Sequence, residues 1–324
     1  MKRNAILTLS VLLLTTAASA ATNEIRTHDP STVVRDGDTY WVFHTGRGCK
    51  SEFSPDLKNW SVGPPVFPQP LAWWTDAAPG SNLDVWAPDV IKIGPRFFLY
   101  YSVSVWNKQT SVIGLAVNDT LDPHRADFLW KDMGPVIQTS HADNFNAIDP
   151  AMSFDEKGRL WLIFGSYWSG IKAVELDPKT GKRIAANSPV HSLAAAKPPS
   201  TAIEASYVYR HGEFFYLFVN WGQCCKGTNS TYVVGVGRSR SISGPYVDRD
   251  GNGMLNGGGT VFLEKSGRFI GPGHIGILHD GNVEWCSYHF YDAEENGRPK
   301  LKVERLAWDA EGWPSLSENR NSPP

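Results

Sequence analysis

A short apolar run, a polar glycine turn and an aromatic strand recur along this chain, and this repeat constrains the fold more than any other feature. The unit occurs five times, at residues 33–43, 90–100, 152–164, 207–218 and, more weakly, 275–285. Each copy predicts a β-hairpin, because β-branched and aromatic residues flank a turn that contains glycine. The copies recur roughly every 55 to 70 residues, which leaves room for about four strands each and is typical of β-propeller blades.

The remaining sequence fits the same all-β architecture. Residues 111–117 and 231–237 also have the composition of strands, and only residues 192–197 suggest a short helical turn, which Pro198-Pro199 would end. No change of composition marks a linker, so we predict one domain, a five-bladed β-propeller over residues 21–324. Its blades are expected to begin near Asp29, Trp86, Asp149, Glu204 and Gly273.

The first twenty residues are expected to lie outside the folded domain. Lys2 and Arg3 precede an apolar stretch, residues 5–16, that is too short to span a bilayer, and residues 18–20 read Ala-Ser-Ala. This order is typical of a secretory signal peptide with cleavage after Ala20. The alternative is an uncleaved N-terminal anchor. We predict a secreted or periplasmic protein that has no contact with a membrane once the signal is removed.

The amino-acid composition indicates which classes of molecule the protein can bind. Charged residues make up 20% of the chain and the formal net charge is −2, so no basic surface suited to nucleic acid is expected. Aromatic residues make up 12%, with thirteen tryptophans, more than a core of this size usually needs, and sugar-binding clefts are one place where exposed aromatic rings serve. Trp41, Trp161 and Trp285 occupy matching strand positions, and we expect them to pack between blades.

The four cysteines are Cys49, Cys224, Cys225 and Cys286, and their spacing is not that of a structural zinc site. The adjacent Cys224 and Cys225 could form a vicinal disulfide, or each could pair elsewhere, because sequence alone does not fix connectivity. We interpret all four as structural.

Three carboxylates occupy one position of the repeat. When the first, third and fourth copies are aligned on their turn glycines, Asp29, Asp149 and Glu204 fall at or within one residue of the same point. That point is the start of the innermost strand, which lines the central channel of a propeller. Each acid alone could be a turn former or a surface residue. As a matched set in apolar surroundings they indicate a catalytic site.

Converging carboxylates in an aromatic channel favour glycoside hydrolysis, in which one acid is protonated while another stays ionised. A third carboxylate would raise the pKa of the acid by like-charge repulsion and hold it in place.

The motifs around these acids resemble those of glycoside hydrolase family 43, and most closely its arabinan endo-1,5-α-L-arabinanases. They span nearly the whole chain in the expected order: HDPS at 28–31, WAPD at 86–89, FNAIDP at 145–150, FGSYWSGI at 164–171, IEA at 203–205 and GPGH at 271–274. The resemblance implies a five-bladed propeller that cleaves arabinan with inversion. It implies Asp29 as general base, Glu204 as general acid, and Asp149 as the residue that tunes and orients the acid. Inversion requires about 6.5–9.5 Å between the base and acid carboxyls.

The same motifs suggest how substrate is held. We expect arabinan or its oligosaccharides to contact His28 and the faces of Trp86 and Trp168, with Asn146 and Ser166 bonding hydroxyls. Either tryptophan could instead pack between blades. We expect the protein to act as a monomer.

The resemblance also implies a metal ion, usually calcium with mostly water ligands, bound by His274. Calcium prefers oxygen, so a hydrogen-bonded channel histidine is the alternative. Residues 248–253 resemble the start of a calcium-binding helical loop, but Gly259 stands where that loop needs glutamate, and we interpret the segment as a polar turn.

Three functions are compatible with this sequence. The first is endo-acting cleavage of α-1,5-linked arabinan, and the second is an exo-acting arabinofuranosidase or β-xylosidase, which would share the three carboxylates. The third, a carbohydrate-binding propeller without activity, is disfavoured because all three carboxylates are present.

Overall fold

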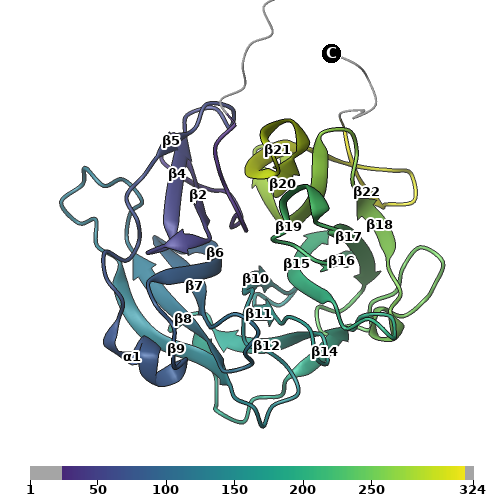
Figure 1. Ribbon diagram of the computed structural model, residues 1–324, viewed down its shortest axis with the longest axis horizontal. Coiled ribbons are helices and arrows are strands. Elements are labelled where there is room, and N and C mark those ends of the chain that lie inside the picture. The colour runs from purple at the N-terminus through teal and green to yellow at the C-terminus, as the bar shows by residue number, and fades with distance from the viewer. Residues whose placement is uncertain (1–23, 318–324) are drawn as a thin grey trace, which may run out of the picture.

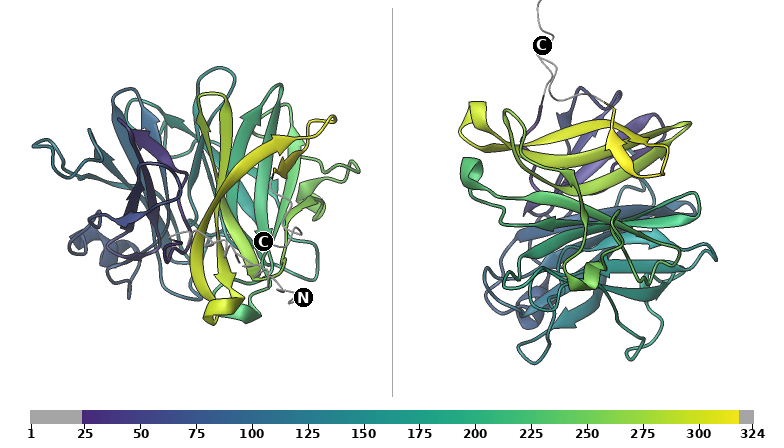
Figure 2. Two further views of the ribbon diagram at one scale, coloured as in Figure 1. Left: turned by 90° about the horizontal axis from the view of Figure 1, so that it is seen from above. Right: turned by 90° about the vertical axis from the view of Figure 1, so that its right-hand side faces the viewer.

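The computed structural model describes residues 24–317 as five antiparallel sheets arranged in a ring (Figure 1). The side views show that the strands run between the two faces of this ring (Figure 2). The predicted all-β, five-bladed propeller is confirmed. The proposed signal peptide, residues 1–20, lies outside the described residues. Within residues 24–317, no helix is long and apolar enough to cross a membrane.

Each of the five sheets is one blade, built from strands consecutive in the chain except for short additions. The first blade contains β1 (Val34–Asp36), β2 (Thr39–His44), β4 (Lys50–Ser54) and β5 (Ser61–Val62). The second contains β6 (Asp84–Ile93), β7 (Arg96–Val103), β8 (Ser111–Asn118) and β9 (Lys131–Thr139), with β3 (Gly46–Arg47) added beside β6.

The third blade contains β10 (Ala151–Phe154), β11 (Leu160–Phe164), β12 (Ile171–Asp177), β13 (Lys182–Arg183) and β14 (His191–Ala194). The fourth contains β15 (Ile203–His211), β16 (Phe214–Trp221), β17 (Val233–Ser239) and β18 (Thr260–Leu263). The fifth contains β19 (Phe269–Asp280), β20 (Val283–Asp292), β21 (Arg298–Trp308) and β22 (Pro314–Leu316).

All five predicted hairpins form, and each joins the first two strands of its blade. Their turns depend on glycine, because the backbone there takes a left-handed conformation that other residues adopt only at a cost. The φ values are 59° at Gly37, 58° at Gly94, 73° at Gly158, 59° at Gly212 and 60° at Gly281.

Apolar residues fill the spaces between neighbouring blades rather than one central core. Five clusters occur, one for each pair of neighbours around the ring. Trp41 belongs to the cluster between the first and second blades and Trp161 to that between the third and fourth, while Trp285 packs against the cluster between the fifth and first. The expected packing role of these tryptophans is therefore confirmed.

The N-terminal segment closes the ring by adding to the last blade. The Leu301 amide donates to the Ile25 carbonyl at 3.1 Å, and the Thr27 amide donates to the Pro299 carbonyl at 3.2 Å. This pairing links the start of the first blade to β21 of the fifth, so the ring does not depend on side-chain packing alone at this junction.

The prediction of a helical turn at residues 192–197 is wrong. His191–Ala194 forms strand β14, which pairs with β12 and buries Leu193 and Ala194. Pairing with the sheet outweighs the weak helical preference of this short segment. Helix α1 (Ala72–Ala77), which was not predicted from the sequence, places the fully buried Trp74 against the second blade. Three short 3-10 helices complete the structure: η1 (Gly227–Asn229), η2 (Met254–Asn256) and η3 (Ala293–Glu295).

Candidate active site

A cleft of about 850 Å³ contains the residues that the sequence singled out for catalysis and sugar binding. All three carboxylates and all five predicted substrate contacts line it: Asp29, Asp149, Glu204, His28, Trp86, Asn146, Ser166 and Trp168. His274 is not among the lining residues and is buried. The first four blades each contribute to the cleft, so residues far apart in sequence meet there, as the propeller predicts.

A left-handed non-glycine residue lies in the inner strand of three blades and before the inner strand of the first and third blades. The φ values are 49° at Asp29, 42° at Ala87, 57° at Asp149, 51° at Ala205 and 60° at His274. The strand pairing shifts register at this point in the second, fourth and fifth blades. Such bulges turn side chains away from the regular strand direction and are enriched beside active sites.

This repeated conformation refines the alignment of the carboxylates. Asp29 and Asp149 occupy the left-handed position itself, whereas Glu204 immediately precedes it. The side chain of Glu204 is therefore attached one residue before the left-handed position, whereas those of the two aspartates are attached at it. All three residues lie near the start of an inner strand.

Asp29 is held by contacts from two blades. Its Oδ2 accepts hydrogen bonds from Thr45 Oγ1 at 2.6 Å and His28 Nδ1 at 2.8 Å. Its backbone N–H donates to His289 Nδ1 at 3.0 Å. Burial alone would raise the pKa of Asp29, but His28, His274 and His289 hold that pKa well below its usual range. Asp29 is therefore ionised.

Glu204 is held by two hydroxyl groups. Ser166 Oγ donates to Oε2 at 2.7 Å, and Tyr232 Oη donates to Oε1. Burial raises the pKa of Glu204, although these two hydrogen bonds favour its ionised form and oppose the increase. Ser166 lines the cleft as predicted, but its hydroxyl contacts the carboxylate.

Asp149 precedes strand β10 and contacts the second and fourth blades. Its Oδ2 accepts from the Ala205 amide at 3.0 Å, and its own amide donates to Ser102 Oγ at 3.0 Å. Burial raises its pKa well above the usual value, and the charges of Glu204 and Asp29 add to the increase. The hydrogen bond to Ala205 fixes the residue next to Glu204, which couples the positions of the two carboxylates.

The three carboxylates therefore differ in the protonation state that their surroundings favour. Asp29 is kept ionised by histidines, whereas burial and mutual repulsion favour the protonated forms of Asp149 and Glu204. Titratable groups with pKa values driven apart are the pattern expected of a base and an acid in one site.

Aromatic and amide groups supply the surfaces of the cleft. Trp168 is 43% exposed, and the half-buried Trp86 packs edge-to-face against Trp106 with ring centroids 6.3 Å apart. Trp106 is 64% exposed, lines the cleft and was missed by the sequence analysis. Asn146 is buried, and its Oδ1 has no hydrogen-bond partner among residues 24–317, so a sugar hydroxyl could fill that bond.

His274 lies next to Asp29, with 3.6 Å between His274 Nδ1 and Asp29 Oδ1. Its backbone N–H donates to Asn220 Oδ1 at 3.0 Å, which fixes the bulge that carries it. Calcium takes six to eight oxygen ligands, whereas this position offers one imidazole and one nearby carboxylate. The donor set fits a hydrated cation with mostly water ligands.

Several residues that hold the carboxylates carried no recognised signal in the sequence. Thr45 and Tyr232 lie outside the repeated position, and His289 lies on the second strand of the fifth blade. Their contacts join residues that are distant in the chain, so the hairpin pattern alone could not identify them.

Three carboxylates with pKa values driven apart, in one cleft of a propeller, are the arrangement expected of a glycoside-cleaving enzyme. The family model for glycosyl hydrolases family 43 matches residues 22–314. The chain belongs to this family.

Individual relatives cover nearly the full chain. The chain is 40% identical to an extracellular endo-α-(1→5)-L-arabinanase of Bacillus subtilis, with 94% of this chain and 93% of that protein aligned. It is 37% identical to an extracellular exo-α-(1→5)-L-arabinofuranosidase of Cellvibrio japonicus, over 95% and 91%. The structure of a Cellvibrio cellulosa α-L-arabinanase complexed with arabinohexaose matches with a TM-score of 0.87 and 36% identity, covering 92% of this chain and 97% of that one.

Proposed function

We propose that this protein hydrolyses the α-1,5 bonds between L-arabinofuranosyl residues of arabinan, by single displacement with inversion. The observation that carries the proposal is that three carboxylates meet in one cleft, with Asp29 held by His28 and Thr45, and Glu204 held by the hydroxyls of Ser166 and Tyr232. The names of the similar proteins support the same substrate class.

In the proposed mechanism, Asp29 is the general base. It takes a proton from a water molecule, whose oxygen attacks the anomeric carbon of the sugar. Glu204, protonated, gives its proton to the glycosidic oxygen as that bond breaks. Thr45 and His28 hold the base carboxylate, and Ser166 and Tyr232 hold the acid.

Asp149 acts through its neighbours. Because like charges repel in this buried site, ionisation of Asp149 and Glu204 at the same time is disfavoured, and the hydrogen bond from the Ala205 amide to Asp149 orients the backbone beside the acid.

We propose endo action as the main mode, and exo action as the second candidate, because relatives of both kinds align over nearly the full chain. The test is to incubate the protein with linear arabinan and follow chain length and the anomer of the first product. Early mixed oligosaccharides indicate endo action, and a single small product indicates exo action. A product that keeps the anomeric configuration of the substrate would contradict single displacement.

We also propose that the protein is secreted and that His274 holds a hydrated calcium ion. The extracellular relatives support the first proposal. When bound, the ion would add positive charge near the carboxylates and favour their ionised forms. Elemental analysis of the wild type and His274→Ala tests it, and equal calcium content in the two would contradict this ligand.

A further inference from the structure

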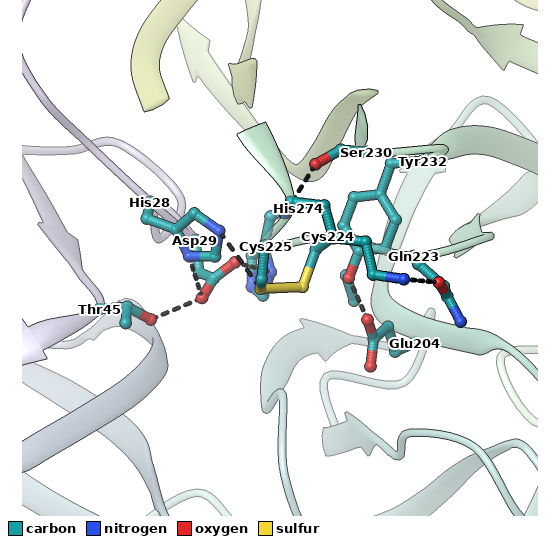
Figure 3. Close-up of a disulfide and its surroundings, with 12 residues drawn as sticks. His28, Asp29, Thr45, Glu204, Gln223, Cys224, Cys225, Ser230, Tyr232 and His274 are labelled. Atoms are coloured by element: carbon teal, nitrogen blue, oxygen red, sulfur yellow. Dashed lines mark hydrogen bonds and ion pairs between the residues drawn. A yellow bond between two sulfur atoms is a disulfide. The ribbon is translucent and has the colours of Figure 1, made fainter. Parts of the chain in front are cut away.

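The disulfide between Cys224 and Cys225 lies in the cleft rather than in the packed interior. It follows strand β16 and precedes η1, and Figure 3 draws it with His28 and Asp29 on one side and Tyr232 and Glu204 on the other (Figure 3). Cys225 is exposed and Cys224 is half-buried, so the disulfide presents surface to the space that holds substrate. The structure thus selects the vicinal pairing from the two alternatives that the sequence left open.

The segment that carries the disulfide is anchored at both ends. The Gln223 amide donates to Thr231 Oγ1 at 3.0 Å, and the Thr231 amide donates to the Gln223 carbonyl at 2.9 Å. The Lys226 amide donates to Ser230 Oγ at 3.1 Å. These bonds close a short loop whose tip is the pair of cysteines.

The tip also contacts the residues that hold the base. The Cys225 amide donates to Tyr291 Oη at 2.7 Å, and this hydroxyl lies 2.7 Å from His28 Nε2. Cys225 Sγ is 3.8 Å from the same His28 nitrogen. Because His28 also bonds Asp29, the disulfide lies one residue away from the carboxylate that would activate water.

The chemistry of a disulfide suits the apolar side of a sugar ring. Its two sulfur atoms are polarisable and carry no N–H or O–H donor, so they favour contact with C–H groups over hydrogen bonds. Joining adjacent residues also fixes both side chains in one arrangement, so no rotamer freedom is lost when a ligand binds. The cleft also holds Trp86, Trp106 and Trp168, which offer aromatic faces.

We propose that the Cys224–Cys225 disulfide is a substrate-binding surface, which packs against a pentofuranosyl residue of the polysaccharide beside Asp29. The proposal rests on the proposed function for the identity of the sugar. It assigns to the disulfide a role in affinity for substrate, and it predicts little effect on the chemical step.

The first test compares the affinity of two proteins for arabinohexaose by titration calorimetry. Both carry Glu204→Ala, so that the ligand is not cleaved, and one also carries Cys224→Ser and Cys225→Ser. Loss of a contact of this kind weakens binding by up to about tenfold, and we expect a change of this size. Thr228→Ser, in the same loop but outside the cleft, is the matched control and should bind like its parent. Equal affinity with and without the disulfide would overturn the proposal.

The second test uses steady-state hydrolysis of arabino-oligosaccharides by the otherwise unchanged chain. The Cys224→Ser, Cys225→Ser protein should show a raised KM with kcat changed by less than about threefold and an unchanged pH profile. A lower kcat at unchanged KM would instead mean that the cysteines act by positioning His28 and Asp29, and would overturn the proposed sugar contact.

The third test is chemical reduction of the disulfide, which needs no substitution in the folded protein. A dithiol reagent transfers two electrons and two protons to the disulfide, leaving two thiols, and is itself oxidised to a cyclic disulfide. Reduced wild type should show the same rise in KM, and the double serine variant should not respond. If the wild type binds arabinohexaose but does not hydrolyse arabinan, the proposed function fails while the calorimetric test still decides the role of the disulfide. If the wild type does not bind arabinohexaose at all, the proposed function and the proposed role of the disulfide both fail.

Discussion

At the scale of single residues, Glu204 is held in place by two hydroxyl groups, from Ser166 and Tyr232, and a substitution of Glu204 tests its role as the acid. Glu204→Gln keeps an oxygen that accepts a hydrogen bond but removes the proton that the leaving oxygen needs. We expect kcat on arabinan to fall by about 10²–10⁴, with thermal stability retained. Substrates with an acidic phenol leaving group should lose much less, because they depart without protonation.

The control for this substitution is Glu213→Gln, an exposed acid of the same blade that pairs with Arg240. It should retain wild-type turnover. Unchanged turnover of arabinan by Glu204→Gln would contradict the assignment of the acid.

Asp149 and Asp155 are both acids of the third blade, but their environments shift their pKa values in opposite directions. Burial raises the pKa of Asp149, whereas backbone hydrogen bonds and Arg159, at 2.6 Å, outweigh burial and lower the pKa of Asp155. A raised pKa in the folded state means that stability is lost as pH rises, because the unfolded chain ionises more readily. A lowered pKa means that stability is lost as pH falls.

Asp149→Asn should therefore raise the free energy of unfolding at pH 7, and the gain should shrink towards pH 4. Asp155→Asn should lower it at pH 7, with the loss also shrinking as pH falls. Urea unfolding at the two pH values checks both signs. A loss of stability in Asp149→Asn at pH 7 would contradict the electrostatic account. Activity should fall in Asp149→Asn despite the added stability.

At the scale of the element, a left-handed non-glycine residue lies in or before each inner strand, and in the fourth blade this residue is Ala205, next to Glu204, which lines the cleft. Alanine tolerates φ of 51° at Ala205 poorly, glycine tolerates it freely, and a β-branched residue least of all. Ala205→Val should cost about 1–3 kcal/mol of stability and reduce kcat, because the strand moves to relieve the strain.

The comparison variant is Ala205→Gly, which keeps the backbone conformation accessible. It should retain activity close to wild type, and its stability should change by less than about 1 kcal/mol. Urea unfolding and turnover on arabinan measure both effects. If valine and glycine behave alike at this position, the bulge does not direct the acid.

At the scale of the whole molecule, the ring is closed where the fifth blade meets the first. This junction has the smallest apolar cluster of the five: Val33, Val42, Leu57, Trp60 and Leu301. Charged groups reinforce it. Glu24 lies 2.5 Å from Arg268 and 3.4 Å from Lys300, and both cations also contact the buried Asp292.

Glu24→Gln should therefore lower the free energy of unfolding by about 1–3 kcal/mol, since it removes the charge that balances partly buried cations. The exposed pair of Glu213 and Arg240 provides the comparison, and Glu213→Gln should cost less than about 1 kcal/mol. Hydrogen exchange should locate the early opening of Glu24→Gln at β1 and β21. Equal losses of unfolding free energy in Glu24→Gln and Glu213→Gln would mean that the charged groups at the ring closure stabilise the fold no more than an exposed ion pair does.

The sequence by itself determined the number of blades and the three carboxylates. Both follow from local patterns, because a turn that needs glycine recurs in all five units and an acid recurs at the same position in three of them. Local patterns failed where a neighbour decided the outcome, as in strand β14, which forms against β12 although its sequence suggested a helical turn.

The tertiary structure determined the surroundings that shift the pKa values of these acids apart. The pKa of Asp29 is lowered first by its neighbour His28 and further by the distant His274 and His289. The hydroxyl that Tyr232 donates to Glu204 also comes from a distant segment. It likewise decided that Cys224 and Cys225 pair with each other and face the cleft. A pKa and a cleft surface depend on which groups lie within a few ångströms in space, and that proximity is created by closing the ring rather than by the order of residues.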